Sequence, residues 1–78
     1  MTLNIISAAE VLFKGDVAAA TLPGTLGEFT VLHNHASLVA LLGKGKLRYQ
    51  LPDGSEHTHD IPGGVADIDN NVINVCVY

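Results

Sequence analysis

The stretch KLRYQLPDGSEHTHD, residues 46–60, decides the fold class because it reads as two strands joined by a short turn. Residues 52–54 at its centre are Pro-Asp-Gly. Proline suits the fixed φ of a type I turn, and glycine suits the positive φ that closes a three-residue loop with a bulge. Such a loop pairs Leu51 with Ser55 and fixes the register of both strands.

This register sorts the side chains of the hairpin onto two faces. One face pairs Tyr49 with His57 and Leu47 with His59, and the other pairs Gln50 with Glu56, Arg48 with Thr58 and Lys46 with Asp60. A two-residue Asp-Gly turn would instead set the acidic positions of the second strand against the apolar positions of the first. Because each favourable cross-strand pair contributes about 0.2–1 kcal/mol, we predict the three-residue loop.

The rest of the chain also alternates strand-like segments with turn residues, at about the 8–12-residue spacing that is typical of β-sandwiches. We expect strands over residues 3–6, 11–13, 17–22, 29–32, 38–42, 46–51, 55–61, 65–69 and 72–78. Residues 38–42 lack alternation and could also form a helical turn, but we predict a strand there. The fold class is therefore all-β, a flattened antiparallel β-sandwich or barrel.

Length and composition limit the possible functions. The 78 residues form a single domain, 1–78, and the 47% hydrophobic content excludes disorder. With a net charge of −4 and four basic residues, neither nucleic acid nor insertion into lipid is expected. One cysteine, Cys76, allows no internal disulfide and fits a reducing cytosol. A small apolar domain of this kind is expected to need a partner that covers part of its surface.

The candidate chemistry is limited to two His-x-His pairs. These are His33 with His35 and His57 with His59, and each pair places two imidazoles on one side of an extended chain. One hypothesis is therefore a small cupin-like metal-binding β-barrel, although the positions expected for two further ligands carry Val39 or Ala40 and Asp67. Cys76 lies in a Val-Cys-Val strand context, where a free thiol is typically a small hydrophobe. We predict no catalytic residue, no cofactor and no metal.

Residues 22–29, Leu-Pro-Gly-Thr-Leu-Gly-Glu-Phe, predict a tight turn with little freedom to lose on docking. The turn carries Leu26 and a lone acid, Glu28, and we expect it to make a protein contact. His35 is expected at the same end of the sandwich.

Several motifs in order resemble one known family. They are LPGTLGEFTVL at 22–32, His-Ala-x-Leu at 35–38, Gly-x-Leu-Arg-Tyr at 45–49, Gly-Gly-x-x-x-Ile at 63–68 and Asn-x-Ile-x-Val at 71–75. Together they resemble the N-terminal β-sandwich domain of the epsilon subunit of the bacterial rotary (F-type) ATP synthase. The resemblance covers essentially the whole chain.

The resemblance implies a flattened sandwich of about ten short strands and a non-catalytic rotor subunit. Such a subunit clamps the gamma subunit to the membrane c-ring, within a hetero-oligomeric complex at the cytoplasmic face of the membrane, and couples ion translocation to ATP synthesis. By position, the residues that match the family's c-ring contact are Thr25, Leu26, Glu28 and His35, and those near the gamma subunit are Ser7 and Ala40.

The chain departs from the family pattern in two places. Residues 34–37 are Asn-His-Ala-Ser, where the family commonly has Gly-His-Ala-Pro. The family usually continues into a C-terminal helical hairpin, which the 78 residues do not contain. We therefore expect neither inhibition of ATP hydrolysis nor nucleotide binding from this chain.

Overall fold

The computed structural model describes residues 1–78 as nine strands without a helix. The strands are β1 (Thr2–Ile6), β2 (Val11–Asp16), β3 (Ala19–Gly24), β4 (Gly27–Leu32), β5 (Leu38–Leu42), β6 (Gly45–Gln50), β7 (Glu56–Ile61), β8 (Gly64–Asp69) and β9 (Val72–Val77). The all-β prediction is confirmed, and the ambiguous residues 38–42 form a strand. The structure has no helix that is long and apolar enough to span a bilayer.

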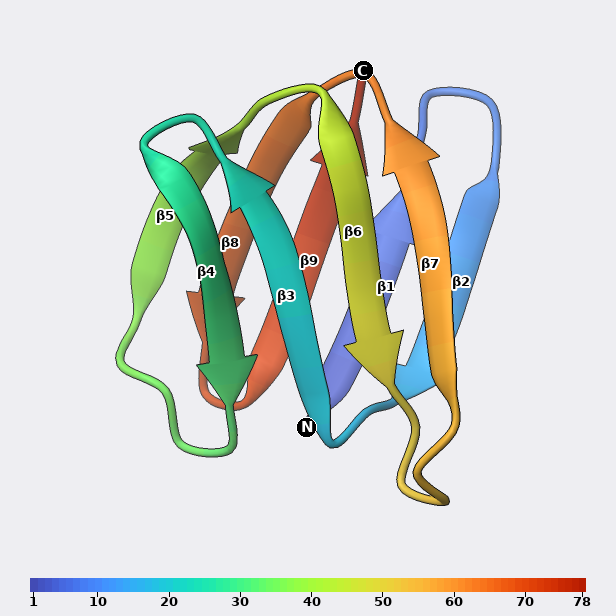
Figure 1. The fold of residues 1–78 in the computed structure, drawn as a ribbon, viewed down its shortest axis with the longest axis vertical. Coiled ribbons are helices and arrows are strands. Elements are labelled where there is room, and N and C mark those ends of the chain that lie inside the picture. Colours follow the sequence, from blue (N-terminus) through green and yellow to red (C-terminus); the bar gives the residue numbers. More distant parts are fainter.

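The strands form one strongly curled sheet in the order β2-β1-β9-β8-β5-β3-β6-β7, with β4 paired to the other side of β3. The curl creates two layers (Figure 1). Strands β4, β3, β6 and β7 form the front layer, and β5, β8, β9, β1 and β2 form the back layer. The layers join where β3 meets β5, through a single register pair between Gly24 and Leu42.

One pairing differs from the antiparallel arrangement that we predicted. Strands β1 and β9 run parallel, with Leu3 opposite Ile73 and Ile5 opposite Val75. The β8–β9 hairpin fixes the direction of β9, which then lies between β8 and β1. The first and last strands of the chain are therefore neighbours in the middle of the back layer.

The hairpin of residues 46–60 has the predicted register at every pair from Gly45 opposite Ile61 to Gln50 opposite Glu56. The Leu51 amide donates to the Ser55 carbonyl at 2.8 Å, which closes the three-residue loop. Gly54 has a φ of +93°, as the bulged turn requires. Hydrogen bonds from the hydroxyl and the amide of Ser55 hold the pKa of Asp53 below its usual value.

The core lies between the two layers and consists of side chains that alternate inward along each strand. Leu3, Leu22, Leu47 and Ile73 are fully buried there. Burying one such side chain contributes about 1.5–3 kcal/mol. Cys76 lies on the outer side of β9 and is exposed, so its expected behaviour as a packed small hydrophobe is wrong.

An aromatic cluster closes the side of the sandwich where β2 and β7 are not hydrogen-bonded to one another. The rings of Phe13 and Tyr49 are 4.4 Å apart, and the rings of His57 and His59 stack against Tyr49. The Tyr49 hydroxyl lies 3.3 Å from Nε2 of His59. Burial raises the pKa of Tyr49 above its usual value.

Candidate functional site

The sequence predicts a protein contact at the β3–β4 turn. Leu26 at its tip is fully exposed, and Gly27 has a φ of +134°. The Thr25 amide donates to the Leu41 carbonyl at 3.0 Å, and the Gly43 amide donates to the Pro23 carbonyl at 2.8 Å. The turn is therefore fastened to β5 and its neighbouring loop, and it presents an apolar side chain on a pre-shaped backbone.

A hollow of about 300 Å³ lies between the turn, β4 and β5. We call it the β4–β5 hollow, and its lining residues are Gly24, Thr25, Leu26, Gly27, Phe29, Leu38, Val39, Ala40 and Leu41. Strand β4 pairs only with β3, so its other edge borders this hollow. An apolar hollow beside an exposed leucine can accept an apolar side chain from a partner protein.

Glu28 is not the lone acid that the sequence indicated. Its carboxylate lies 2.9 Å from a guanidinium nitrogen of Arg48, and both side chains are about half exposed. The pair joins β4 to β6 across β3 on the front of the molecule. The sequence alone does not indicate this contact, because the contact depends on the relative positions of three strands and the hairpin of residues 46–60 includes only one of them.

His35 does not lie at the same end as Thr25 and Leu26, so that expectation is wrong. Strand β4 starts at the turn and runs the length of the layer before the loop that contains His35 (Figure 1). Six residues in a strand place its two ends roughly 17 Å apart. The His35 ring lies at the far end, with its Nδ1 2.7 Å from the Ala36 carbonyl oxygen.

The two residues assigned to a gamma contact lie on the back layer and the loop above it. Ser7 follows β1, and its hydroxyl oxygen accepts hydrogen bonds from the amides of Ala9 and Glu10 at 3.3 Å and 3.2 Å. Ala40 lies on β5 opposite Ala66 and also lines the β4–β5 hollow. The Ser7 loop and the β3–β4 turn lie at the same end of the sandwich (Figure 1).

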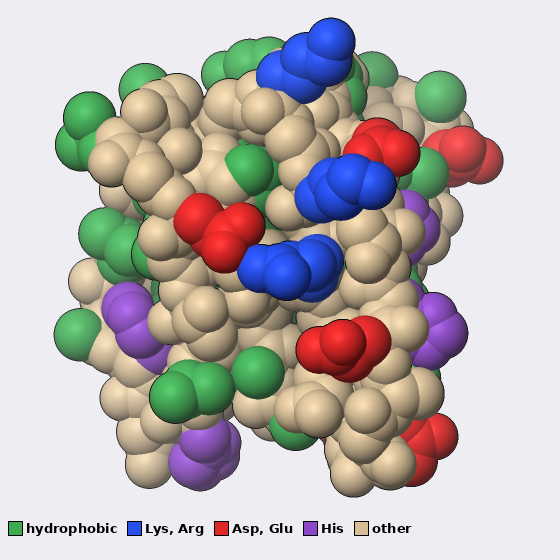
Figure 2. All heavy atoms as spheres, in the orientation of Figure 1, with side chains coloured by type: hydrophobic (Ala, Val, Ile, Leu, Met, Phe, Trp, Pro, Cys, Tyr) green, Lys and Arg blue, Asp and Glu red, His purple; other side chains and the backbone are tan.

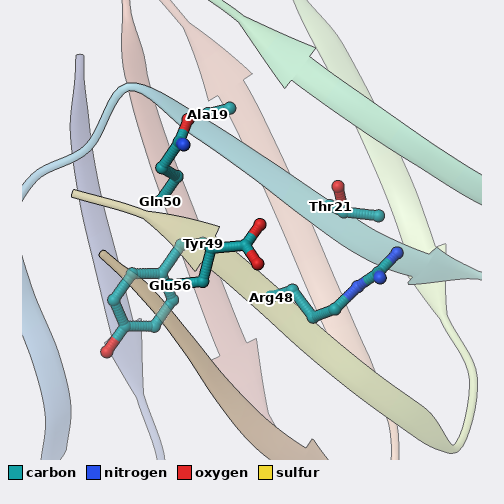
Figure 3. A pocket seen from close by; sticks show the side chains of 6 residues that line it. All are labelled: Ala19, Thr21, Arg48, Tyr49, Gln50 and Glu56. Atoms are coloured by element: carbon teal, nitrogen blue, oxygen red, sulfur yellow. The ribbon is translucent and has the colours of Figure 1, made fainter. Parts of the chain in front are cut away.

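The front layer has a second, smaller depression of about 260 Å³. Figure 3 shows its lining residues Ala19, Thr21, Arg48, Tyr49, Gln50 and Glu56. The Tyr49 ring points away from the Arg48 guanidinium in this view. Arg48 already pairs with Glu28, so the uncompensated charge at the depression is the negative charge of Glu56.

The four histidines do not converge, so the hypothesis of one cupin-like metal site is wrong. His33 and His35 lie in the loop after β4, whereas His57 and His59 lie on β7. Histidine side chains accordingly appear on opposite sides of the molecule in Figure 2. No group of three or more potential metal ligands occurs in the structure.

Comparison with known sequences identifies one family over the whole chain. The family model described as "ATP synthase, Delta/Epsilon chain, beta-sandwich domain" matches residues 1–78. An ATP synthase epsilon chain of Chlorobaculum tepidum is 40% identical over 70 residues, which cover 90% of this chain and 80% of the relative. An epsilon chain of Nitratiruptor sp. is 39% identical over 71 residues, which cover 91% of this chain and 55% of the relative. The chain thus spans about half the length of several of the relatives that it matches.

Comparison with solved structures gives the same result. A chain in the OSCP/F1/c-ring structure of the Euglena gracilis mitochondrial ATP synthase matches with a TM-score of 0.90 and 28% identity, over 96% of this chain and 48% of that one. A chain in the central stalk/c-ring structure of the Tetrahymena thermophila enzyme matches with a TM-score of 0.75, 13% identity, and coverage of 97% and 61%. The second match shows a shared fold alone.

Proposed function

Because the chain belongs to the delta/epsilon β-sandwich family of ATP synthase, we propose that it is a non-catalytic central-stalk subunit that clamps the gamma subunit to the c-ring. Through this clamp the subunit couples ion translocation to ATP synthesis. It works as a peripheral protein at the cytoplasmic face of the membrane, within the hetero-oligomeric complex.

The observation that carries this proposal is the match to a chain of the Euglena OSCP/F1/c-ring assembly. The matched residues cover 96% of this chain with a TM-score of 0.90. Nearly all of this chain therefore superposes on about half of a protein that is found in such an assembly. A rigid sandwich with docking surfaces, rather than a cavity with reactive groups, is what a clamp requires.

For the c-ring contact we propose the β3–β4 turn, with Thr25 and Leu26, followed by Glu28 on β4. His35 lies at the other end of β4 and contributes a separate contact in this arrangement. The exposed edge of β4 then lies along the ring, so that both ends of one strand touch it. Leu26 and the β4–β5 hollow supply apolar contact, and the rim charge of Glu28 contributes more to orientation than to affinity.

For the gamma contact we propose the Ser7 loop and the region of β5 around Ala40. Both are away from the outer side of the front layer, where the charged side chains of both signs lie in Figure 2. The two proposed contacts meet at the β4–β5 hollow, which Ala40 also lines, and the Ser7 loop belongs to the gamma contact alone.

Affinity purification from native membranes tests this function. A tag is placed on this chain, the membranes are solubilised in mild detergent, and the recovered proteins are identified by mass spectrometry. We expect gamma and c subunits in amounts stoichiometric with the chain. Recovery of the tagged chain without gamma, under conditions that keep the rest of the complex assembled, would contradict the proposal.

A further inference from the structure

Asp53 and Gly54 form the single Asp-Gly step of the chain, and they lie at the tip of the hairpin of residues 46–60. Every other aspartate precedes valine, isoleucine or asparagine, and no asparagine precedes glycine. Glycine has no side chain that shields its amide nitrogen, so in an Asp-Gly step this nitrogen can approach the aspartate side chain. This step is therefore the place in the chain where a backbone rearrangement at aspartate is sterically easiest.

The rearrangement proceeds through a cyclic imide, a succinimide. The Gly54 nitrogen bonds to Cγ of Asp53 and loses its proton, and the hydroxyl of the neutral carboxyl group leaves as water. A water molecule then opens the ring. Cleavage of the bond between the nitrogen and Cγ returns aspartate. Cleavage of the bond between the nitrogen and the main-chain carbonyl carbon of Asp53 leaves isoaspartate, in which the main chain runs through Cβ and Cγ.

No neighbouring group blocks this ring sterically. Asp53 and Gly54 are exposed, and their loop projects beyond the neighbouring loops at one end of the molecule (Figure 1). No heavy atom lies within 4 Å of the place that a Cβ on Gly54 would occupy. The obstacles to ring closure are therefore the hydrogen bonds within the turn itself.

Three hydrogen bonds hold the reacting groups of the turn. The hydroxyl and the amide of Ser55 both donate to Oδ1 of Asp53, at 2.6 Å and 2.9 Å, so the carboxylate is turned toward Ser55. The Gly54 amide donates to the Leu51 carbonyl at 2.9 Å. Ring closure must remove the proton of this amide and must turn the carboxyl group toward the Gly54 nitrogen. The closed turn therefore opposes both movements.

The same contacts favour the unreactive form of the carboxyl group. Hydrogen bonds from Ser55 stabilise the charged form and hold the pKa of Asp53 below its usual value. The neutral carboxyl group reacts because its hydroxyl leaves as water, whereas the carboxylate has no such leaving group. At neutral pH the folded turn accordingly contains less of the reactive form than an unfolded chain does.

We propose that Asp53 is an isoaspartate modification site, and that Ser55 and Leu51 protect it for as long as the hairpin is closed. The modification adds a methylene group to the main chain of a loop whose closure fixes the β6–β7 register. Isoaspartate at Asp53 should therefore weaken the hairpin. The enzymes that would recognise the modified loop are methyltransferases that act on isoaspartyl carboxyl groups.

Ageing of the purified chain at neutral pH tests the site and its protection. The chain is incubated folded and, in parallel, unfolded in guanidinium chloride. Isoaspartate is located by peptide mapping with electron-transfer fragmentation and is quantified by enzymatic methylation. We expect it at Asp53, formed at least about tenfold faster in the unfolded chain. Equal rates would overturn the protection, and an unfolded chain without isoaspartate at Asp53 would overturn the site.

Substitutions of serine test which contacts protect the site. Ser55→Ala removes the hydroxyl donor, and we expect isoaspartate to form roughly three- to tenfold faster in the folded variant. Ser55→Thr keeps the hydroxyl and should keep the rate of the unmodified chain. Ser37→Ala is the matched control, because Ser37 is also exposed and donates to an aspartate, Asp69, that does not precede glycine. This control should leave the rate at Asp53 unchanged.

Thermal unfolding separates local opening of the turn from unfolding of the whole domain. Rates are compared at a temperature where every variant is fully folded, so a faster reaction then reports the turn alone. If folded Ser55→Ala reacts no faster than the unmodified chain, protection by the Ser55 hydroxyl is wrong. If Ser37→Ala accelerates the reaction as much as Ser55→Ala, the effect is not specific to the turn and the proposed protection is also wrong.

Discussion

Asn34 and Asn71 hold each other through two hydrogen bonds that join the front layer to the back layer. The Asn34 amide donates to Oδ1 of Asn71 at 2.6 Å, and Nδ2 of Asn71 donates to Oδ1 of Asn34 at 3.0 Å. Both residues have positive φ, +64° and +61°. Asparagine at position 34 therefore adopts the left-handed conformation that glycine would favour and adds a side-chain link that glycine could not make.

This link leads to a testable difference between two substitutions of Asn34. Asn34→Ala removes the side-chain acceptor and leaves alanine with a positive φ, so we expect a loss of about 1–2 kcal/mol in the free energy of unfolding. Asn34→Gly removes the same acceptor without the backbone strain and should cost less. Urea unfolding of both variants measures the difference, and equal destabilisation would show that the backbone conformation contributes nothing.

Replacement by alanine should affect Gly54 and Gly64 differently, because only at Gly64 would the added Cβ meet another atom. Gly54 has a φ of +93° but nothing within reach of an added Cβ, so Gly54→Ala should cost about 1 kcal/mol from backbone strain. At Gly64 the added Cβ would collide with the Cys76 carbonyl oxygen of the paired strand. Gly64→Ala should therefore lower the melting temperature much more than Gly54→Ala, and the reverse order would contradict the register of β8 and β9.

Glu28 can be tested separately as an ion-pair member and as a contact residue. Glu28→Lys breaks an exposed pair, so we expect a stability change below about 1 kcal/mol but weaker coupling of ATP hydrolysis to ion pumping in membrane vesicles. The exchange Glu28→Lys with Arg48→Glu restores a pair of opposite charges on the same two strands. If this exchange also restores coupling, Glu28 acts through Arg48 rather than through a partner.

Ionisation of Tyr49 should make the folded domain less stable at alkaline pH. Burial raises its pKa above the ordinary value, so the folded state favours the neutral phenol. The stabilisation is present below the ordinary pKa of tyrosine, about 10, and is lost as the pH rises through the raised pKa of the folded state. Melting temperatures between neutral and alkaline pH measure this loss. Tyr49→Phe should make the melting temperature fall less steeply with pH. An unchanged fall would show that other groups cause it.

The sequence predicted local structure well because local structure depends on side-chain alternation and turn chemistry. The hairpin of residues 46–60 has the predicted register, because glycine at position 54 admits only a few turn types and one of them separates apolar from charged residues. Strand β5 was correctly predicted although it lacks alternation.

Long-range relationships were less accessible to sequence analysis. The parallel pairing of β1 with β9 joins the two ends of the chain, and no local pattern encodes it. The Glu28–Arg48 pair spans three strands, and the separation of His35 from Leu26 follows from the direction and length of β4. The alignment of exposed apolar residues across the outer side of the back layer likewise appears only when five strands are placed in register.

The central claim, that this chain couples the c-ring to the rest of the motor, is tested most directly by removal and return of the chain in native membrane vesicles. ATP-driven ion pumping and ATP hydrolysis are measured in vesicles depleted of the chain, and again after it is added back. The account predicts that depletion abolishes pumping while hydrolysis continues, and that the added chain restores pumping. Full pumping by vesicles that lack the chain would contradict it.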